Sequence, residues 1–162
     1  MKVAVVMGSD SDLPVLKPAI ELLHEFGVEA EVIVASAHRT PLKVQELVSS
    51  AQDRGVGAFI SAAGAAAHLG GVIASYTTLP VIGVPINATA LNGIDALLST
   101  VQMPSGIPVA TMAINGAKNA AIFVVEIFAL SNPELKQKLA QYRAKMVEEV
   151  EAKAAKVAKE LQ

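Results

Sequence analysis

The chain has 162 residues, enough for one domain with a sizeable core, and its net charge of −2 does not favour nucleic acid or an anionic membrane as a partner. It has no cysteine, which excludes disulfides, thiolate zinc sites and a cysteine nucleophile and fits a reducing compartment. No stretch of about 18 strongly apolar residues indicates a transmembrane helix, and no signal-peptide pattern precedes the first apolar run, so we expect a cytoplasmic protein.

Short apolar runs alternate with helical patterns along most of the chain. Strands are predicted at residues 2–7, 30–35, 58–62, 80–84 and 108–110, and helices at 12–26, 41–54, 66–76, 92–102 and 117–130. The strands lie roughly 22–30 residues apart, which leaves room for the helical crossovers that parallel strands require. Continuous Val, Ile and Ala runs are typical of a parallel sheet covered on both faces, and Gly27 and Gly55 are expected to end the first two helices. The pattern predicts an α/β fold.

The last part of the chain predicts one long amphipathic helix at 133–162, with Asn132 as its N-cap and Pro133 as its first residue. An apolar stripe recurs at spacings of three and four residues, at Leu135, Leu139, Tyr142, Met146 and Val150. Such a helix is about 42 Å long, longer than a compact domain of this size is wide, so we expect its stripe to pack on a neighbouring subunit. The alternative is a solvated, frayed end beyond Val150. Residues 1–162 are expected to form a single domain, an α/β core at 1–132 followed by this helix.

Charge is nearly absent from the middle of the chain. Between Gly57 and Pro133 the only charged residues are Asp95, Lys118 and Glu126. Large surfaces with little charge usually belong to subunit interfaces, so we expect a homo-oligomer with extensive contacts. The alternative is a deeply buried Ala- and Gly-rich core, for which a domain of this size has little interior.

Polar side chains follow the first predicted strand, in the segment Gly8-Ser9-Asp10-Ser11-Asp12. Hydroxyl groups and the N-terminus of the next helix can hold a phosphate. Two carboxylates would repel a phosphate, so at least one is expected to face elsewhere, and ribose hydroxyls are natural partners for it. The alternative is that these serines and aspartates only cap the helix.

The second predicted strand ends in Ser36-Ala37-His38-Arg39-Thr40-Pro41, where Thr40 is the expected N-cap of the next helix. Histidine is the side chain whose ordinary pKa suits proton transfer near neutral pH, and arginine is a permanent cation suited to phosphate or carboxylate. Ligands of open α/β sheets bind at the carboxyl ends of strands. These residues therefore indicate a proton-transfer site with an anion anchor, and the alternative is a structural turn histidine beside a surface arginine.

The third predicted strand leads into a run of small residues from Ser61 to Gly71, interrupted by His68 and Leu69. Small side chains let the backbone approach a flat ligand or a small group closely. The alternative for the alanines is tight helix packing or a subunit contact. His68 is either a second polar group of the pocket or a capping residue.

Four motifs follow one another along the chain. They are Met-Gly-Ser-Asp-Ser-Asp at 7–12, Ser-Ala-His-Arg-Thr-Pro at 36–41, Ala-Ala-His-Leu at 66–69, and Gly-Ile-Asp-Ala-Leu at 93–97 with Val-Gln-Met-Pro-Ser-Gly-Ile-Pro-Val at 101–109. Together they resemble the N5-carboxyaminoimidazole ribonucleotide mutase family of purine biosynthesis, long called the catalytic subunit of phosphoribosylaminoimidazole carboxylase. The likeness covers about residues 2–130.

The resemblance implies a flavodoxin-like three-layer α/β/α subunit, an octamer in which the C-terminal helix reaches onto a neighbour, and a substrate that carries an aminoimidazole on ribose 5-phosphate. It implies that His38 is catalytic. It places Ser9, Asp12 and Arg39 at nucleotide-binding positions, and Ser11, Ser36, Gly64, His68 and Leu69 in the loops of the substrate pocket.

The third loop departs from the family pattern, which reads Ala-Gly-x-Gly-Gly-Ala-Ala-His-Leu-Pro-Gly. Ala62 and Ala65 replace glycines, and Gly70 replaces the proline. Two added methyl groups are expected to narrow the pocket, and Gly70 is expected to loosen the loop. A related branch that uses free carbon dioxide lacks the His-Leu pair, so His68 and Leu69 favour the mutase.

The resemblance implies a reaction that moves a carboxylate from the exocyclic nitrogen of the imidazole to ring carbon 4. This is an isomerisation, so no ATP, biotin or metal is expected, and His24, His38 and His68, 14 and 30 residues apart, do not have the spacing of a metal site. One residue over the ring could serve both proton transfers, and His38 is the candidate. An ATP-dependent synthetase that makes the unstable substrate is the expected functional partner.

Three other functions remain open. One is direct carboxylation of aminoimidazole ribonucleotide, or of another nucleotide ring, with free carbon dioxide. Another is a flavodoxin-like module that binds a nucleotide or flavin, although the first loop lacks the Thr-rich phosphate motif of that group and only Tyr76 and Tyr142 could stack on a ring. The third is a purely structural oligomer.

Overall fold

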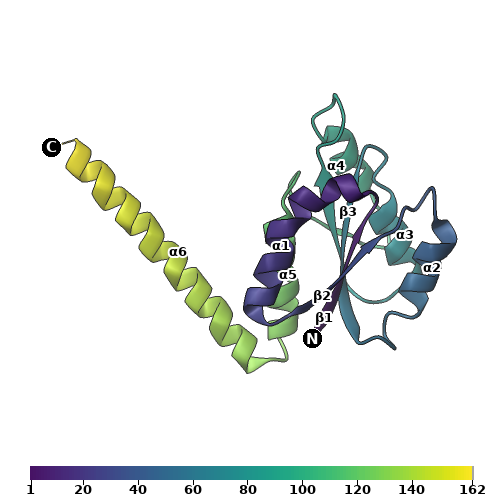
Figure 1. Cartoon of the computed structure of the whole chain (residues 1–162), viewed down its shortest axis with the longest axis horizontal. Helices are drawn as coiled ribbons and strands as arrows, with labels where there is room; N and C mark the ends of the chain where they lie inside the picture. Colours follow the sequence, from purple (N-terminus) through teal and green to yellow (C-terminus); the bar gives the residue numbers. More distant parts are fainter. Residues whose placement is uncertain (162) are drawn as a thin grey trace. The chain divides into compact units, whose positions relative to one another are not determined.

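The computed structural model describes residues 1–161 and confirms an α/β fold built on a five-stranded sheet (Figure 1). The chain divides into two compact units, one from Met1 to Val124 and one that begins at Val125. The strands are β1 Lys2–Met7, β2 Glu29–Val34, β3 Val56–Gly64, β4 Val81–Ile86 and β5 Ala110–Thr111. All neighbouring strands are parallel, and the order β2-β1-β3-β4-β5 is that of flavodoxin-like folds.

Helices connect the strands as the sequence predicts. They are the short 3-10 helix η1 Asp10–Asp12, α1 Leu13–Phe26, α2 Pro41–Ser49, α3 Leu69–Tyr76, α4 Ile94–Val101, α5 Ala117–Ala129 and α6 Pro133–Glu160. In Figure 1, α1 lies on the opposite side of the sheet from α2 and α3. The sheet of the first unit is therefore covered on both faces.

The core of the first unit is centred on the inner strands. Every residue from Val3 to Met7 is at most 1% exposed, and β4 is buried along its whole length. Phe59 of β3 belongs to the same buried cluster as Val44 of α2 and Ile73 of α3. These strands have the continuous apolar sequences of strands that are covered on both faces.

Strand β2 differs from this expectation because it forms the edge of the sheet. Its Val32 and Val34 are 44% and 45% exposed in the single chain. Val32 and Val34 are two residues apart and so lie on the same face of the sheet. The prediction that the apolar runs are covered on both faces is therefore wrong for this strand in the single chain, where that face is partly uncovered.

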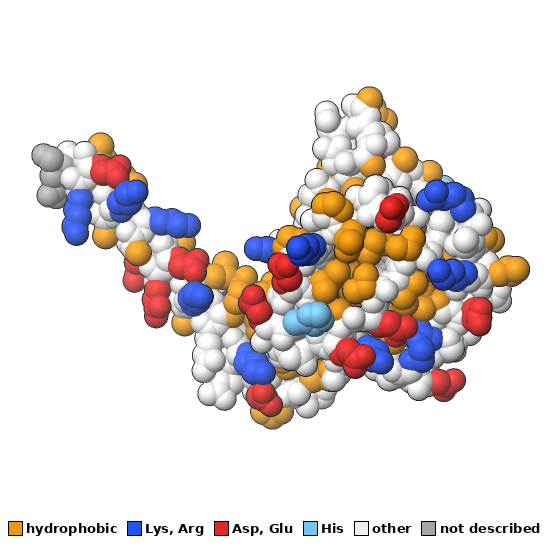
Figure 2. All heavy atoms as spheres, in the orientation of Figure 1, with side chains coloured by type: hydrophobic (Ala, Val, Ile, Leu, Met, Phe, Trp, Pro, Cys, Tyr) orange, Lys and Arg blue, Asp and Glu red, His pale blue; other side chains and the backbone are white. Residues whose placement is uncertain are grey.

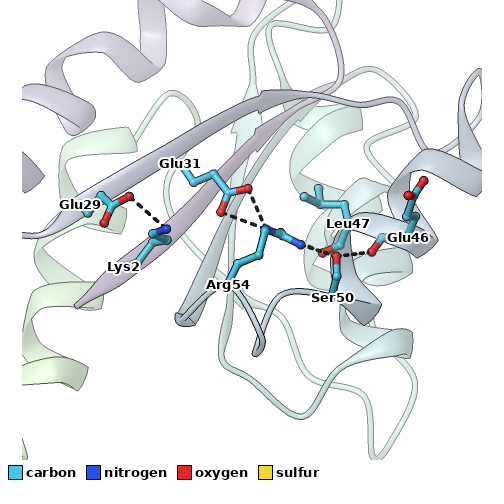
Figure 3. A network of polar contacts seen from close by, with 7 residues as sticks. All are labelled: Lys2, Glu29, Glu31, Glu46, Leu47, Ser50 and Arg54. Atoms are coloured by element: carbon cyan, nitrogen blue, oxygen red, sulfur yellow. Dashed lines mark hydrogen bonds and ion pairs between the residues drawn. The ribbon is translucent and has the colours of Figure 1, made fainter.

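Helix α2 ends at Ser49, five residues earlier than predicted, and Gly55 is not its cap. Arg54 takes that role from a distance: its Nη2 donates to the carbonyl of Leu47 at 3.0 Å, and its Nη1 donates to the hydroxyl of Ser50 (Figure 3). Its Nε also donates to Glu31 of β2 at 3.0 Å, so one guanidinium joins the end of α2 to the edge strand. Gly55 instead lies in the turn before β3 with a φ of +77°. Gly27, by contrast, ends α1 in the left-handed conformation as predicted.

The second unit contains the long helix α6, whose 28 residues confirm the predicted amphipathic helix. The side chain of Asn132 caps it by accepting from the amide of Leu135 at 3.1 Å, and charged side chains of both signs follow one another along it (Figure 2). Of the predicted stripe, Leu135 and Leu139 are already buried within the chain, whereas Met146 is 50% and Val150 64% exposed. Only the outer part of the stripe is left uncovered. No helix within residues 1–161 is long and apolar enough to cross a membrane.

Candidate functional site

A cavity of about 390 Å³ lies where β1, β2 and β3 end. The loop after each strand contributes to its wall, which contains the following predicted site residues: Ser9, Ser11, Asp12, Ser36, His38, Arg39, Gly64 and Leu69. His68 does not line the cavity itself, but its ring touches that of His38. The structure thus brings all nine predicted residues together at the carboxyl-terminal ends of the strands, where ligands of such folds bind.

The loop after β1 is organised by its own side chains. Ser9 and Asp12 cap η1 reciprocally: Ser9 Oγ accepts from the amide of Ser11 at 3.3 Å, and the amide of Ser9 donates to Asp12 Oδ2 at 3.1 Å. Ser11 Oγ in turn donates to Ser9 Oγ at 2.9 Å. The capping alternative is therefore true, yet the same side chains also line the cavity.

Asp12 is the buried carboxyl group of this loop, with only 5% of its surface exposed. Burial raises its pKa above the ordinary value, and the nearby charge of Asp10 adds to the rise, while the amide hydrogen bonds from Ser9 and Gly8 and the cation of Arg39 oppose it. A carboxylate that burial has stripped of water is stabilised by new hydrogen-bond donors such as ribose hydroxyls.

Arg39 joins the first loop to the second. Its Nη2 donates to the carbonyl of Gly8 at 2.8 Å, and its Nε donates to Ser36 Oγ at 3.4 Å. These bonds use two of the five N–H groups of a guanidinium. Within residues 1–161 the other three make no hydrogen bond, so a fixed cation with free donors lies beside the hydroxyls of Ser9 and Ser36.

The turn that carries Arg39 is held by Thr40. As predicted, Thr40 occupies the N-cap position of α2 with Pro41 as the first helical residue, but its hydroxyl makes no bond to the helix. It instead accepts from the amide of Ser36 at 2.9 Å and donates to the Ser36 carbonyl at 3.2 Å. The hydroxyl closes the loop on itself, which fixes the backbone of both His38 and Arg39.

His38 and His68 form a direct pair. His38 Nε2 lies 2.9 Å from His68 Nδ1, and the rings meet edge to face at a centroid distance of 5.0 Å. His38 comes from the loop after β2 and His68 from the loop after β3, and both are exposed in the single chain. Sequence reasoning placed each histidine in the site but did not predict their contact.

Two of the effects expected from the departures of the third loop from the family pattern are wrong. Ala62 is fully buried in β3 and does not line the cavity, so its methyl group does not narrow it. Gly70 lies in the first turn of α3, not in the loop, so it cannot loosen the loop. Ala65 does line the cavity, and it has a φ of +53°, in the left-handed region that favours glycine.

The fourth strand end was missed by sequence reasoning. Ala88 follows β4 and lines the cavity, and its methyl group lies so close to Gly64 that a Cβ at Gly64 would be 2.6 Å away. A side chain at Gly64 would therefore force the loop after β4 to shift. The amide of Asn87 donates to Asn115 Oδ1 at 3.0 Å, which holds this loop in place. The position of Ala88 directly after a buried strand could have indicated that it belongs to the site, although an alanine side chain by itself suggests no chemistry.

Comparisons with known proteins show the family to which the chain belongs. The family model described as AIR carboxylase matches residues 2–149. The N5-carboxyaminoimidazole ribonucleotide mutase of Pyrococcus horikoshii is 57% identical over 94% of this chain and 86% of its own, and that of Thermotoga maritima is 52% identical over 94% and 90%. The crystal structure of Treponema denticola PurE superposes with a TM-score of 0.87 at 27% identity, covering 96% of this chain and 97% of the other.

Proposed function

Because the chain belongs to the AIR carboxylase family, we propose that it is an N5-carboxyaminoimidazole ribonucleotide mutase of purine biosynthesis. The observation that carries the proposal is the site itself: His38 and the fixed guanidinium of Arg39 share one cavity with the hydroxyls of three serines. Such a cavity suits a nucleotide with one phosphate and a small ring on which a proton must move.

The loops after β1 and β2 are assigned to the ribose 5-phosphate. Arg39 offers charge-assisted donors to the phosphate, and the hydroxyls of Ser9, Ser11 and Ser36 line the cavity beside it. Asp12 is assigned to the ribose hydroxyls, since a carboxylate at the phosphate would be repelled.

The imidazole ring is assigned to the region between His38 and the third loop. Gly64 and Leu69 line this part of the cavity together with three alanines of small volume. Small side chains here leave room for the carboxyl group and bring the backbone close to the ring.

The reaction needs His38 to donate one proton to the substrate and to accept one back from it. His38 protonates the exocyclic nitrogen, the nitrogen–carbon bond breaks, and carbon dioxide is released next to the ring. The gas adds to ring carbon 4, and His38 removes the proton of that carbon, so no proton is consumed overall. Retention of carbon dioxide in the cavity is a proximity effect, which can lower the barrier by several kcal/mol.

The functional unit is proposed to be an octamer in which each C-terminal helix packs on a neighbour. Two uncovered apolar surfaces support an oligomer. On and before α4, Leu91, Ile94 and Leu98 are exposed at helical spacing, in a segment nearly free of charge. The outer part of α6 exposes Met146 and Val150.

The remaining parts of the proposal concern organisation and setting. Residues 1–162 act as a single mutase domain, with a core at 1–132 and the helix at 133–162. The protein works in the cytoplasm, where the absence of cysteine is compatible with a reducing environment. An ATP-dependent synthetase supplies the unstable carboxylated substrate.

A carboxyl-transfer assay tests this function. The ultraviolet absorbance of the ring is followed with N5-carboxylated substrate in the absence of ATP, and in parallel with the uncarboxylated nucleotide plus bicarbonate. We expect turnover from the first donor and loss of at least about 10²-fold in His38→Asn, whose amide cannot carry a proton. Turnover from free carbon dioxide alone would instead identify a direct carboxylase.

A further inference from the structure

The contact between His38 and His68 leaves the two nitrogens of His38 in different positions. Nε2 faces His68 Nδ1 at 2.9 Å. Nδ1 makes no hydrogen bond to any residue between 1 and 161. Because the two ring nitrogens of a histidine cannot exchange places without a flip of the ring, the one that is free is the one available to a substrate.

The protonation states follow from this geometry. To deliver a proton, His38 must be cationic, and a cationic imidazole has an N–H on both nitrogens. Its Nε2–H then points at His68, which can accept only if it is neutral, with the lone pair on Nδ1 and its proton on Nε2. After His38 has given away its other proton, the same hydrogen bond retains the Nε2–H tautomer and leaves a lone pair on Nδ1.

We propose that His68 is a positioning residue that keeps Nε2 of His38 protonated, so that Nδ1 of His38 both gives the proton to the exocyclic nitrogen and takes it back from carbon 4. This inference rests on the proposed function and assigns His68 a role different from direct contact with the substrate. The proton balance closes, since the proton that leaves Nδ1 in the first transfer is replaced at Nδ1 in the second.

The backbones on both sides are anchored in a way that suits this role. His68 precedes α3, its carbonyl accepts from the amide of Val72 at 3.0 Å, and the adjacent Leu69 is 2% exposed. On the other side, the loop of His38 is closed by the bonds between Thr40 and Ser36. Two exposed rings therefore meet on two fixed supports, which gives a hydrogen bond of defined direction.

Two substitutions of His68 separate positioning from binding and from proton relay. His68→Phe retains an aromatic ring without the acceptor, and kcat should fall about 10- to 100-fold, the range of a lost charge-assisted hydrogen bond, with little change in KM. His68→Asn places an amide oxygen near the former Nδ1 and should recover at least about tenfold of that loss, because an acceptor suffices for positioning. His24→Asn, on the exposed side of α1, is the matched control and should behave as wild type.

A spectroscopic measurement tests the tautomer without substrate. The chain has three histidines, so histidine-selective ¹⁵N labelling gives a simple spectrum. In mildly alkaline buffer we expect the neutral His38 ring to be protonated at Nε2 in wild type and in His68→Asn, and to be a mixture of tautomers in His68→Phe.

Each other outcome overturns the proposal. A His38 ring protonated at Nδ1 in wild type reverses the direction of the hydrogen bond. A rise in KM with unchanged kcat in His68→Phe makes His68 a substrate contact, and an equal loss in the Asn and Phe variants makes it a proton relay. Failure of the mutase function itself would be seen separately, as no turnover by the wild-type enzyme.

Discussion

Ala65 allows a test of how the third loop is strained. It has a φ of +53°, whereas the adjacent Ala66, which also lines the cavity, does not have a positive φ. A left-handed conformation costs an L-residue about 1–2 kcal/mol. Replacement of either alanine by glycine also adds freedom to the unfolded chain, at a cost of about 0.4–1 kcal/mol. Ala65→Gly should therefore be neutral to stabilising, and Ala66→Gly should be destabilising.

The difference between the two variants isolates the strain, because the unfolded-state cost is common to both. It should amount to about 1–2 kcal/mol, or about 2–8 °C in Tm for a chain of this length. Thermal or urea unfolding measures it, at one fixed protein concentration because an oligomer's stability depends on concentration. Equal stabilities, or a less stable Ala65→Gly, would refute the idea that Ala65 strains the loop. Activity of Ala65→Gly should not fall, since the family pattern has glycine at this position.

Three further predictions concern the other loops and the C-terminal helix. Arg39→Ala should weaken binding of 5′-phosphorylated ligands by about 1.5–3 kcal/mol, whereas the corresponding nucleosides, measured by calorimetry, should bind both proteins equally. Asp12→Asn should stabilise the fold at neutral pH, because the raised pKa of Asp12 means that its charged form is disfavoured on folding. The gain in stability over wild type should decline as the pH falls. It should vanish below about 3.8, where wild-type Asp12 is protonated in both the folded and the unfolded state. Truncation after Pro133 should produce smaller or aggregated species in light scattering, and an unchanged soluble oligomer would contradict a role of α6 in assembly.

The order of elements could be predicted because it depends on local signals. β1 was predicted residue for residue. α6 was predicted with its cap and its first residue, but it was expected to continue to 162, whereas it ends at Glu160 and Gln162 lies outside the described residues. The end of α2 could not be, because it depends on Arg54, whose partner Glu31 lies 23 residues away on another strand. The predicted start of α3 was also wrong, because the helix begins at Leu69 and not at residue 66. The amides of Ala67 and His68 donate to carbonyls only two residues back, at 2.9 and 2.8 Å, so this segment forms tight turns before the helix begins.

The candidate site could be predicted to the level of residues but not of contacts. Parallel strands place their carboxyl ends at one edge, so the loops after β1, β2 and β3 had to converge whatever their side chains. Whether a given methyl group faces the cavity depends on the pleat of the strand, and for this reason Ala62 was misplaced while Ala65 was not. Ring directions, such as those of His38 and His68, are set by side-chain rotamers that sequence patterns do not specify.

Strand order explains how the groups proposed for phosphate binding and for proton transfer can share the carboxyl ends of the strands. β1 lies between β2 and β3, so the loops after β2 and β3 approach the loop after β1 from opposite sides. From the loop after β2, Arg39 donates to the carbonyl of Gly8 in the loop after β1. His38 of the same loop contacts His68, which lies in the loop after β3. A ligand whose phosphate lies by Arg39 and whose ring lies by His38 would therefore contact the loop after β2 with both of its ends. A shift of that loop should change affinity and turnover together, and Thr40, which closes it, is where such coupled effects are expected.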